Sequence, residues 1–83
     1  MKGTAMATKH GFKRTHNGTE YLMHCDPMPF ADGRFGAQVV ITTGHDGSAV
    51  VERRFPALGE FDTEEEAVEY ARQWGRTWID DNG

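Results

Sequence analysis

Residues 61–80, FDTEEEAVEYARQWGRTWID, constrain the fold most, because capping signals and helical periodicity agree along this segment. Thr63 and Glu66 have the spacing of a capping box, in which the Thr hydroxyl accepts from the third helical amide while the Glu side chain bonds back to the cap. Asp62 with Glu65 is an alternative frame of this motif. A run of three glutamates also suits the positive end of a helix dipole. We therefore predict one helix in this segment.

The predicted helix is amphipathic, with apolar residues on roughly half of its circumference at about 100° per residue. Trp74 and Trp78 lie one turn apart at the centre of this apolar arc, so we expect both rings to anchor the core. An aromatic ligand-binding box formed with Tyr70 is the other interpretation, but aromatic residues at helical spacing are typical of a core. Gly75 costs about 1 kcal/mol relative to Ala, which indicates either a close approach to a sheet or a tolerated weakness.

Three segments before the helix alternate apolar and polar residues as β-strands do: residues 20–25, 34–43 and 48–55. Prolines and an Asp-Gly step predict a long loop at residues 26–33, whereas two glycines predict a hairpin turn at residues 44–47. Pro56 cannot donate to a strand ladder, so the third strand is expected to end there, although a bulge would change its phase. The predicted fold is α+β, a three-stranded antiparallel sheet with one C-terminal amphipathic helix packed on one face (β-β-β-α).

A helix on one face of this sheet leaves the other face open. Alternation places Leu22, Val40 and Val50 on the open face among polar residues, with Arg54 beside them. An exposed apolar patch rimmed by polar residues is typical of a contact surface. We therefore predict a protein interface at Leu22, Val40, Val50 and Arg54.

Residues 1–19 have no sustained periodicity and predict a flexible basic arm ahead of a single domain at residues 20–83. The arm holds four of the nine basic residues and none of the thirteen acidic ones. A basic arm can bind phosphates, and a solvated tail is the alternative interpretation. The Asn-Gly step at 17–18 is interpreted as a flexible turn in the arm. The candidate nucleic-acid contacts are Lys9, Lys13, Arg14, Arg53 and Arg54.

No combination of residues indicates catalysis, a cofactor or a metal. His24 and Cys25 are neighbours on a predicted strand and point to opposite faces, so they do not form a thiolate–imidazole pair. A single cysteine excludes an internal disulfide and a multi-cysteine zinc site, and we expect Cys25 to be a small buried residue. No apolar run approaches the roughly 20 residues that span a bilayer. Without a secretory signal, we expect a soluble, cytoplasmic protein that is not an enzyme.

The segment from Phe61 to Ala67, followed by Tyr70-Ala71-Arg72, resembles the helix start of small bacterial β-β-β-α single-domain proteins of unknown function. This resemblance covers residues 20–81. The predicted sheet with a terminal helix is also similar to integrase-type DNA-binding domains and, more distantly, to double-stranded-RNA-binding folds. Those families place basic residues along their nucleic-acid surface, where this chain offers Arg34, Arg53, Arg54 and the arm.

The predicted function is a non-enzymatic interaction module that binds a protein partner or a second copy through the open sheet face or an edge strand. The alternative is a nucleic-acid-binding accessory protein that uses the basic arm and the sheet arginines. Residues 20–83 carry five basic and thirteen acidic residues, and this acidic charge opposes non-specific binding to nucleic acid.

Overall fold

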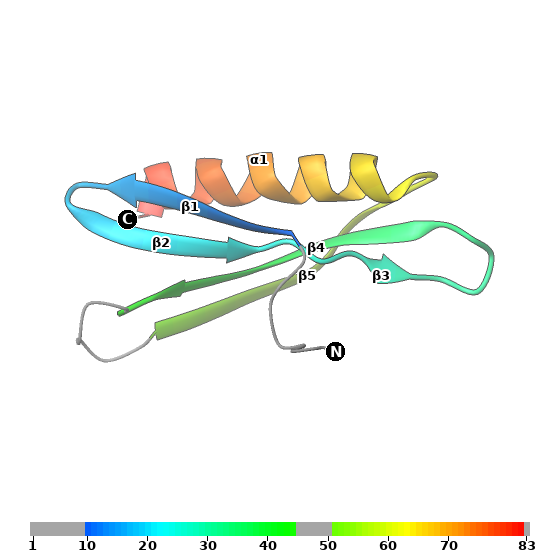
Figure 1. The fold of residues 1–83 in the computed structure, drawn as a ribbon, viewed down its shortest axis with the longest axis horizontal. Helices are drawn as coiled ribbons and strands as arrows, with labels where there is room; N and C mark the ends of the chain where they lie inside the picture. The colour runs from blue at the N-terminus through cyan, green and yellow to red at the C-terminus, as the bar shows by residue number, and fades with distance from the viewer. Residues whose placement is uncertain (1–9, 45–50, 83) are drawn as a thin grey trace, which may run out of the picture.

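The computed structural model describes residues 10–44 and 51–82, in which one helix lies along one face of a five-stranded antiparallel sheet (Figure 1). The elements are β1 (Gly11–His16), β2 (Thr19–His24), β3 (Met28–Pro29), β4 (Phe35–Thr43), β5 (Val51–Phe61) and α1 (Glu64–Asn82). β5 pairs with one edge of β4, while β2 and β3 pair with successive parts of the other edge, and β1 extends the sheet beyond β2. The predicted α+β class is confirmed, but the prediction of three strands is wrong.

The first additional strand, β1, lies inside the segment predicted to be a flexible arm. It pairs with β2 along its whole length, and only Asn17 and Gly18 separate the two strands. Their φ angles of 50° and 79° are those of a type I′ turn, whose twist matches that of a β-hairpin. The sheet therefore begins at Gly11 rather than at residue 20. The prediction for residues 1–9 lies outside the described residues.

The second additional strand, β3, lies inside the predicted loop at residues 26–33 and pairs with the start of β4. The Phe30 amide donates to the Arg34 carbonyl at 2.9 Å, and the Arg34 amide donates to the Asp32 carboxylate at 3.0 Å. Gly33 supplies the φ of 89° that this tight turn requires. The Asp-Gly step therefore closes a short hairpin where the sequence predicts an open loop.

β5 continues beyond Pro56, where the third strand is predicted to end. Its pairing with β4 shifts register between Ala37 and Val39, and Ala57 adopts a φ of 59° at this bulge. Proline is tolerated because β5 is an edge strand, where a missing amide need not cost a ladder hydrogen bond. The bulge lets pairing resume as far as Phe61. Residues 45–50, which cover most of the predicted hairpin turn and the start of the predicted third strand, lie outside the described residues.

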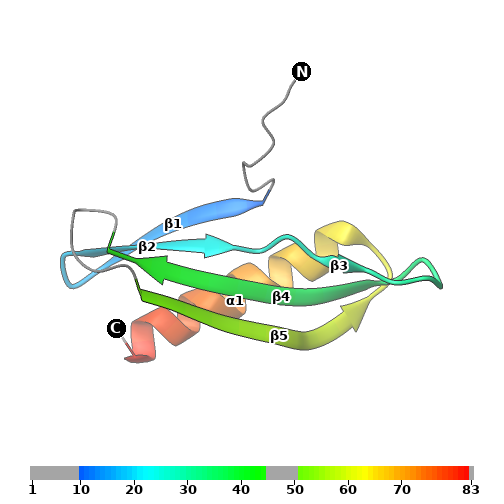
Figure 2. The ribbon, with the colours of Figure 1, turned by 90° about the horizontal axis from the view of Figure 1, so that it is seen from below.

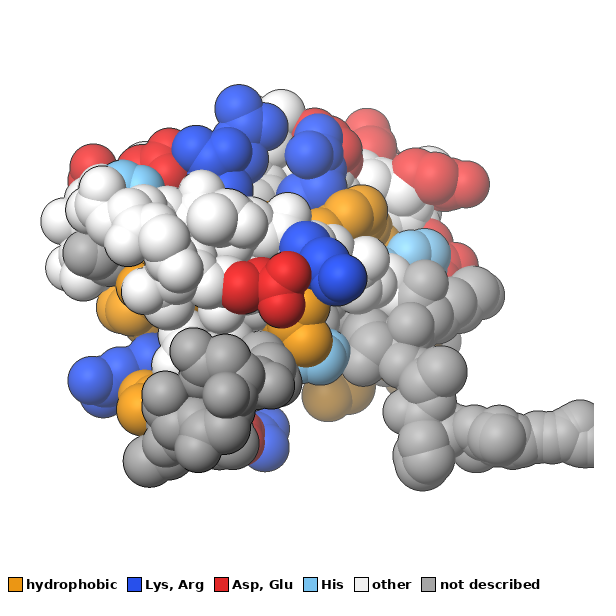
Figure 3. Space-filling view, turned by 60° about the vertical axis from the view of Figure 1, so that its left-hand side comes forward, with side chains coloured by type: hydrophobic (Ala, Val, Ile, Leu, Met, Phe, Trp, Pro, Cys, Tyr) orange, Lys and Arg blue, Asp and Glu red, His pale blue; other side chains and the backbone are white. Residues whose placement is uncertain are grey.

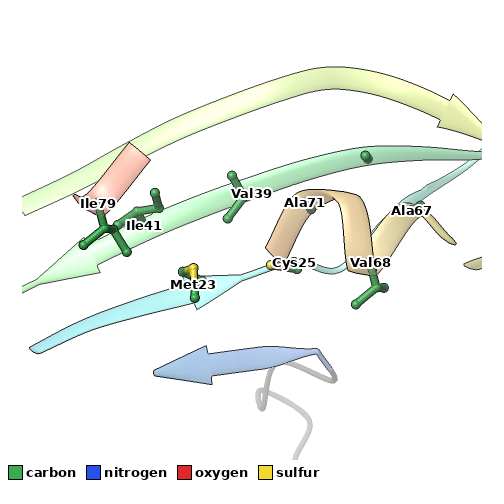
Figure 4. Packing of buried hydrophobic residues seen from close by; sticks show 9 residues of the cluster. Met23, Cys25, Val39, Ile41, Ala67, Val68, Ala71 and Ile79 are labelled. Carbon is green, nitrogen blue, oxygen red and sulfur yellow. The ribbon is translucent and has the colours of Figure 1, made fainter. Parts of the chain in front are cut away.

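The core lies between α1 and the sheet (Figure 4). Its buried hydrophobic residues are Met23, Cys25, Ala37, Val39, Ile41, Ala67, Val68, Ala71 and Ile79. The helix presents small residues to the sheet, because Ala67, Ala71 and Gly75 follow one another at intervals of one turn and are all buried. A Cβ added to Gly75 would lie 3.0 Å from Met23 Sδ and 3.4 Å from Val39 Cγ2. Of the two interpretations of Gly75, the structure supports the close approach.

Trp74 and Trp78 do not lie at the centre of the core, where the helical periodicity places them. Both are only partly buried and lean towards β5, where their ring centroids lie 4.7 Å and 5.2 Å from that of Phe55. A helix held this close to the sheet leaves no room for an indole beneath it. The two rings therefore pack beside the helix rather than under it.

The helix begins in the frame set by Thr63. The Glu66 amide donates to Thr63 Oγ1 at 3.2 Å, and the Ala67 amide donates to the Thr63 carbonyl at 3.3 Å. Glutamates fill the first turn, as the helix dipole favours. The Thr63 frame of the capping motif is thus the one that forms, rather than the frame of Asp62.

We predict that Gly75→Val destabilises the protein by about 1–3 kcal/mol, because the added methyl groups would overlap Met23 and Val39 in a packed core. Arg76→Val is the matched control, since it places the same β-branched residue at the adjacent exposed position. Urea unfolding measures the free energy of unfolding of the two variants and of the wild-type protein. Equal losses in the two variants would contradict a steric role for Gly75.

Candidate functional site

A groove of 690 Å³ follows α1 from its first turn to its last on the side that faces β5. This volume lies within the range of about 300–1,000 Å³ that is typical of ligand sites. Its apolar lining consists of four aromatic side chains: Phe61, Tyr70, Trp74 and Trp78. Helical spacing sets the last three in a row, and Phe61 joins them from the end of β5. We call this feature the aromatic groove.

The aromatic rings of the groove are held from behind and open in front. Phe55 supports both indoles from β5, and Phe61 lies 5.2 Å from Tyr70 between ring centroids. Tyr70 is nevertheless 43% exposed, which is unusual for a large aromatic residue that has a stacking partner. The rings therefore form a fixed apolar surface that solvent can reach.

The rim of the aromatic groove is acidic. Its lining includes Glu66, Glu69 and Asp81, whereas it contains no lysine or arginine. Glu69 accepts hydrogen bonds from Arg72 Nη2 at 2.8 Å and from Gln73 Nε2 at 2.7 Å. These bonds, that from Arg72 above all, lower the pKa of Glu69 and keep it ionised at neutral pH. The groove thus combines an apolar floor with negative charge.

The predicted protein interface lies on the sheet face away from the helix, which Figure 2 presents to the viewer. Pairing aligns Leu22 with Thr42, and it sets Val40 between His24 and Arg54. Leu22 and Val40 are only half-buried rather than fully exposed. Val50 lies outside the described residues. The apolar centre predicted for this face is therefore smaller than the sequence indicates.

The most exposed apolar residues of this face lie at its other end, where the sequence predicts only a loop. Met28 and Phe30 are 48% and 38% exposed and border a cavity of 340 Å³. Phe30 lies across Gly36, where an added Cβ would come within 2.7 Å of its ring. The sequence signal that indicates this surface is the pair of apolar residues on either side of Pro29, Met28 and Phe30.

The predicted nucleic-acid contacts do not gather on one surface. Lys13 and Arg54 lie on the open face at opposite edges of the sheet, whereas Arg14 and Arg53 lie on the helix side. Arg54 is paired with Glu52 at 2.5 Å. Lys9 lies outside the described residues. At the end of the molecule shown in Figure 3, lysine and arginine side chains are interspersed with acidic ones rather than forming a continuous basic surface.

Arg14 holds β1 against the helix. It donates to both carboxylate oxygens of Asp80, at 2.8 Å and 2.7 Å from Nη2 and at 3.1 Å from Nε. At the other end of the strand, His10 Nε2 lies 2.9 Å from Glu64 Oε2. Between these contacts, the Arg72 guanidinium lies over the Phe12 ring at 5.5 Å. Arg14 is one of the predicted phosphate contacts, and its guanidinium is thus bound to a carboxylate of the same chain.

Cys25 is fully buried in the core, as predicted. Burial, together with the nearby Asp26 carboxylate, raises the pKa of its thiol to about 12. A thiol that stays protonated at neutral pH is a poor nucleophile and a poor metal ligand. In the described part of the chain, no group of three or more His, Cys, Asp or Glu side chains is placed to hold a metal ion.

Comparisons of this chain with protein-family models, with curated proteins and with solved structures find no match. The resemblance to small bacterial β-β-β-α proteins therefore stays a prediction. Over the described residues, α1 is not apolar enough to cross a membrane.

We predict that Asp80→Asn destabilises the protein at neutral pH but not in acid. Hydrogen bonds from Arg14, and its positive charge, lower the pKa of Asp80 below its ordinary value of 3.8. A carboxyl whose pKa is lower in the folded state stabilises that state above its unfolded pKa, and the effect disappears as the pH falls through the folded pKa. The difference in unfolding free energy between the two proteins should therefore shrink as the pH falls below 3.8 and close below the lowered pKa of the folded state.

Asp81→Asn is the matched control, because it removes the same charge from the same end of the helix. Urea unfolding of the three proteins at several pH values measures the effect. A loss for Asp80→Asn that is no larger than that for Asp81→Asn, or that persists unchanged in acid, would contradict the role of the Arg14 contact.

Proposed function

We propose that this protein is a non-enzymatic interaction module whose aromatic groove binds a cationic, apolar peptide segment of a partner protein. The observation that carries the proposal is the combination of four aromatic side chains with three carboxylates and no basic residue in one groove. Apolar contact with the rings would supply affinity, while the carboxylates select positive charge.

The length of the groove favours an extended or helical segment over a compact ion. Its lining runs from Glu66 in the first turn of α1 to Asn82 at the end. At about 1.5 Å per residue, this corresponds to roughly 24 Å of helix. Lysine or arginine side chains of a bound segment could lie over the indole faces while their charges meet Glu66 or Asp81, since Glu69 is already paired with Arg72. The segment thus needs apolar residues that alternate with basic ones.

The open sheet face is a weaker candidate for this role. Leu22 and Val40 are half-buried, and charged residues surround them. The candidate basic residues that the structure describes are divided between the two faces, so their placement does not favour the nucleic-acid function either.

We expect a synthetic peptide that alternates lysine with leucine and phenylalanine to change the tryptophan fluorescence on binding. Both tryptophans of the chain line the groove, so the emission reports its occupancy directly. The same peptide with glutamate in place of lysine should bind much more weakly. Raising the salt concentration should weaken the binding of the lysine peptide, because salt screens the attraction between exposed charges.

Glu66→Gln and Asp81→Asn should each weaken the binding of the lysine peptide by about 0.2–1 kcal/mol, which is the size expected for an exposed ion pair. Glu65→Gln is the matched control, since Glu65 is an exposed helical residue that does not line the groove. Equal affinity for the lysine and glutamate peptides, or equal losses in all three variants, would contradict the proposal.

A further inference from the structure

β5 leaves one of its edges open over the described part of the chain. It pairs with β4 alone, and Figure 2 shows it along the border of the sheet. Residues 51–55, VERRF, form the regular part of this strand before the bulge at Pro56 and Ala57. An exposed strand edge carries unpaired backbone donors and acceptors and is a template for another strand.

The sequence of this edge is complementary to itself when it is reversed. In an antiparallel pair of two copies with Arg53 on the twofold axis, Glu52 lies opposite the Arg54 of the other copy, and Val51 lies opposite Phe55. Directly opposed residues in antiparallel strands share a face, and pairs of opposite charge stabilise the ladder. Glu52 and Arg54 both lie on the open sheet face, opposite Thr42 and Val40 of β4.

The register with Arg53 on the axis opposes only Arg53 to itself and gains two Glu52–Arg54 pairs, which the neighbouring registers that keep the two faces consistent lack. A shift of one residue in the axis sets Glu52 against Glu52 or Arg54 against Arg54. Pro56 limits the pairing on one side, because it has no amide to donate. The charge pattern and the proline therefore specify the same register.

We propose that two copies of this chain associate through residues 51–55 of β5, forming one continuous antiparallel sheet with both helices on the same side. The exposure of Val51, which is 46% in the single chain, fits this arrangement because Phe55 of the second copy would cover it. The aromatic groove lies beside the same strand, so association would bring the two grooves to face each other. The inference of association does not rest on the proposed peptide binding.

Charge reversal tests the register. Glu52→Arg and Arg54→Glu should each weaken self-association by at least about tenfold, because each places two like-charged pairs across the dimer. An equimolar mixture of the two variants should associate, since both pairs between positions 52 and 54 of different copies then have opposite charges. The double variant Glu52→Arg with Arg54→Glu should associate with itself. Sedimentation velocity over a range of concentrations measures all four proteins and the mixture.

Cysteine cross-linking tests the twofold axis without changing these charges. Arg53→Cys should form a symmetric disulfide with oxidised glutathione as oxidant, because opposed strand residues lie about 4.5–5.5 Å apart between Cα atoms. Val51→Cys on the same strand is the matched control, since its two copies would lie four residues out of register. The native Cys25 is buried and does not compete.

Arg53 provides a further test of the register, because the Arg53 side chains of the two copies would lie opposite each other at the axis and repel. Arg53→Gln removes this repulsion and should tighten the association. The proposal would be overturned by a wild-type protein that stays monomeric up to its solubility limit, by a charge-reversed mixture that does not associate, or by equal cross-linking at positions 51 and 53. The proposed peptide binding is tested separately, by the change in tryptophan fluorescence.

Discussion

The close contact between α1 and β4 is the constraint from which the remaining features of this protein follow. Ala67, Ala71 and Gly75 bring the helix backbone near Met23 and Val39, so that even one added carbon at Gly75 would crowd the core. Large side chains have no place under such a helix. Trp74 and Trp78 are therefore directed to its side, where Phe55 supports them. The aromatic groove is thus a consequence of small residues in the core.

The two sides of the helix differ in chemistry because they pack against different strands. On the β1 side, Arg14 and His10 hold the strand to the helix through Asp80 and Glu64, so the polar side chains that meet there bind one another. On the β5 side, aromatic rings and carboxylates face solvent. The β1–β2 hairpin thus contacts one side of the helix through polar groups, and the aromatic groove lies on the other side.

The helix, its start at Thr63 and the strand at residues 34–43 could be predicted from the sequence, because local capping and alternation determine them. The Asn17-Gly18 step carried enough information to predict β1, but the lack of sustained periodicity over residues 1–19 favoured an arm instead. β3 is too short to show a period, and its pairing depends on β4. The position of the indoles depends on the depth at which the helix packs, which periodicity alone does not determine. The groove could not be predicted for the same reason.

The bulge at Pro56 and Ala57 has a consequence for the behaviour of this chain at high concentration. Long, flat and uninterrupted strand borders allow identical molecules to stack without limit into fibrils. Here the border of β5 is broken after Phe55 by a residue without an amide proton and by a backbone kink with a φ of 59°. The irregularity costs some strand regularity and protects the chain from cross-β aggregation.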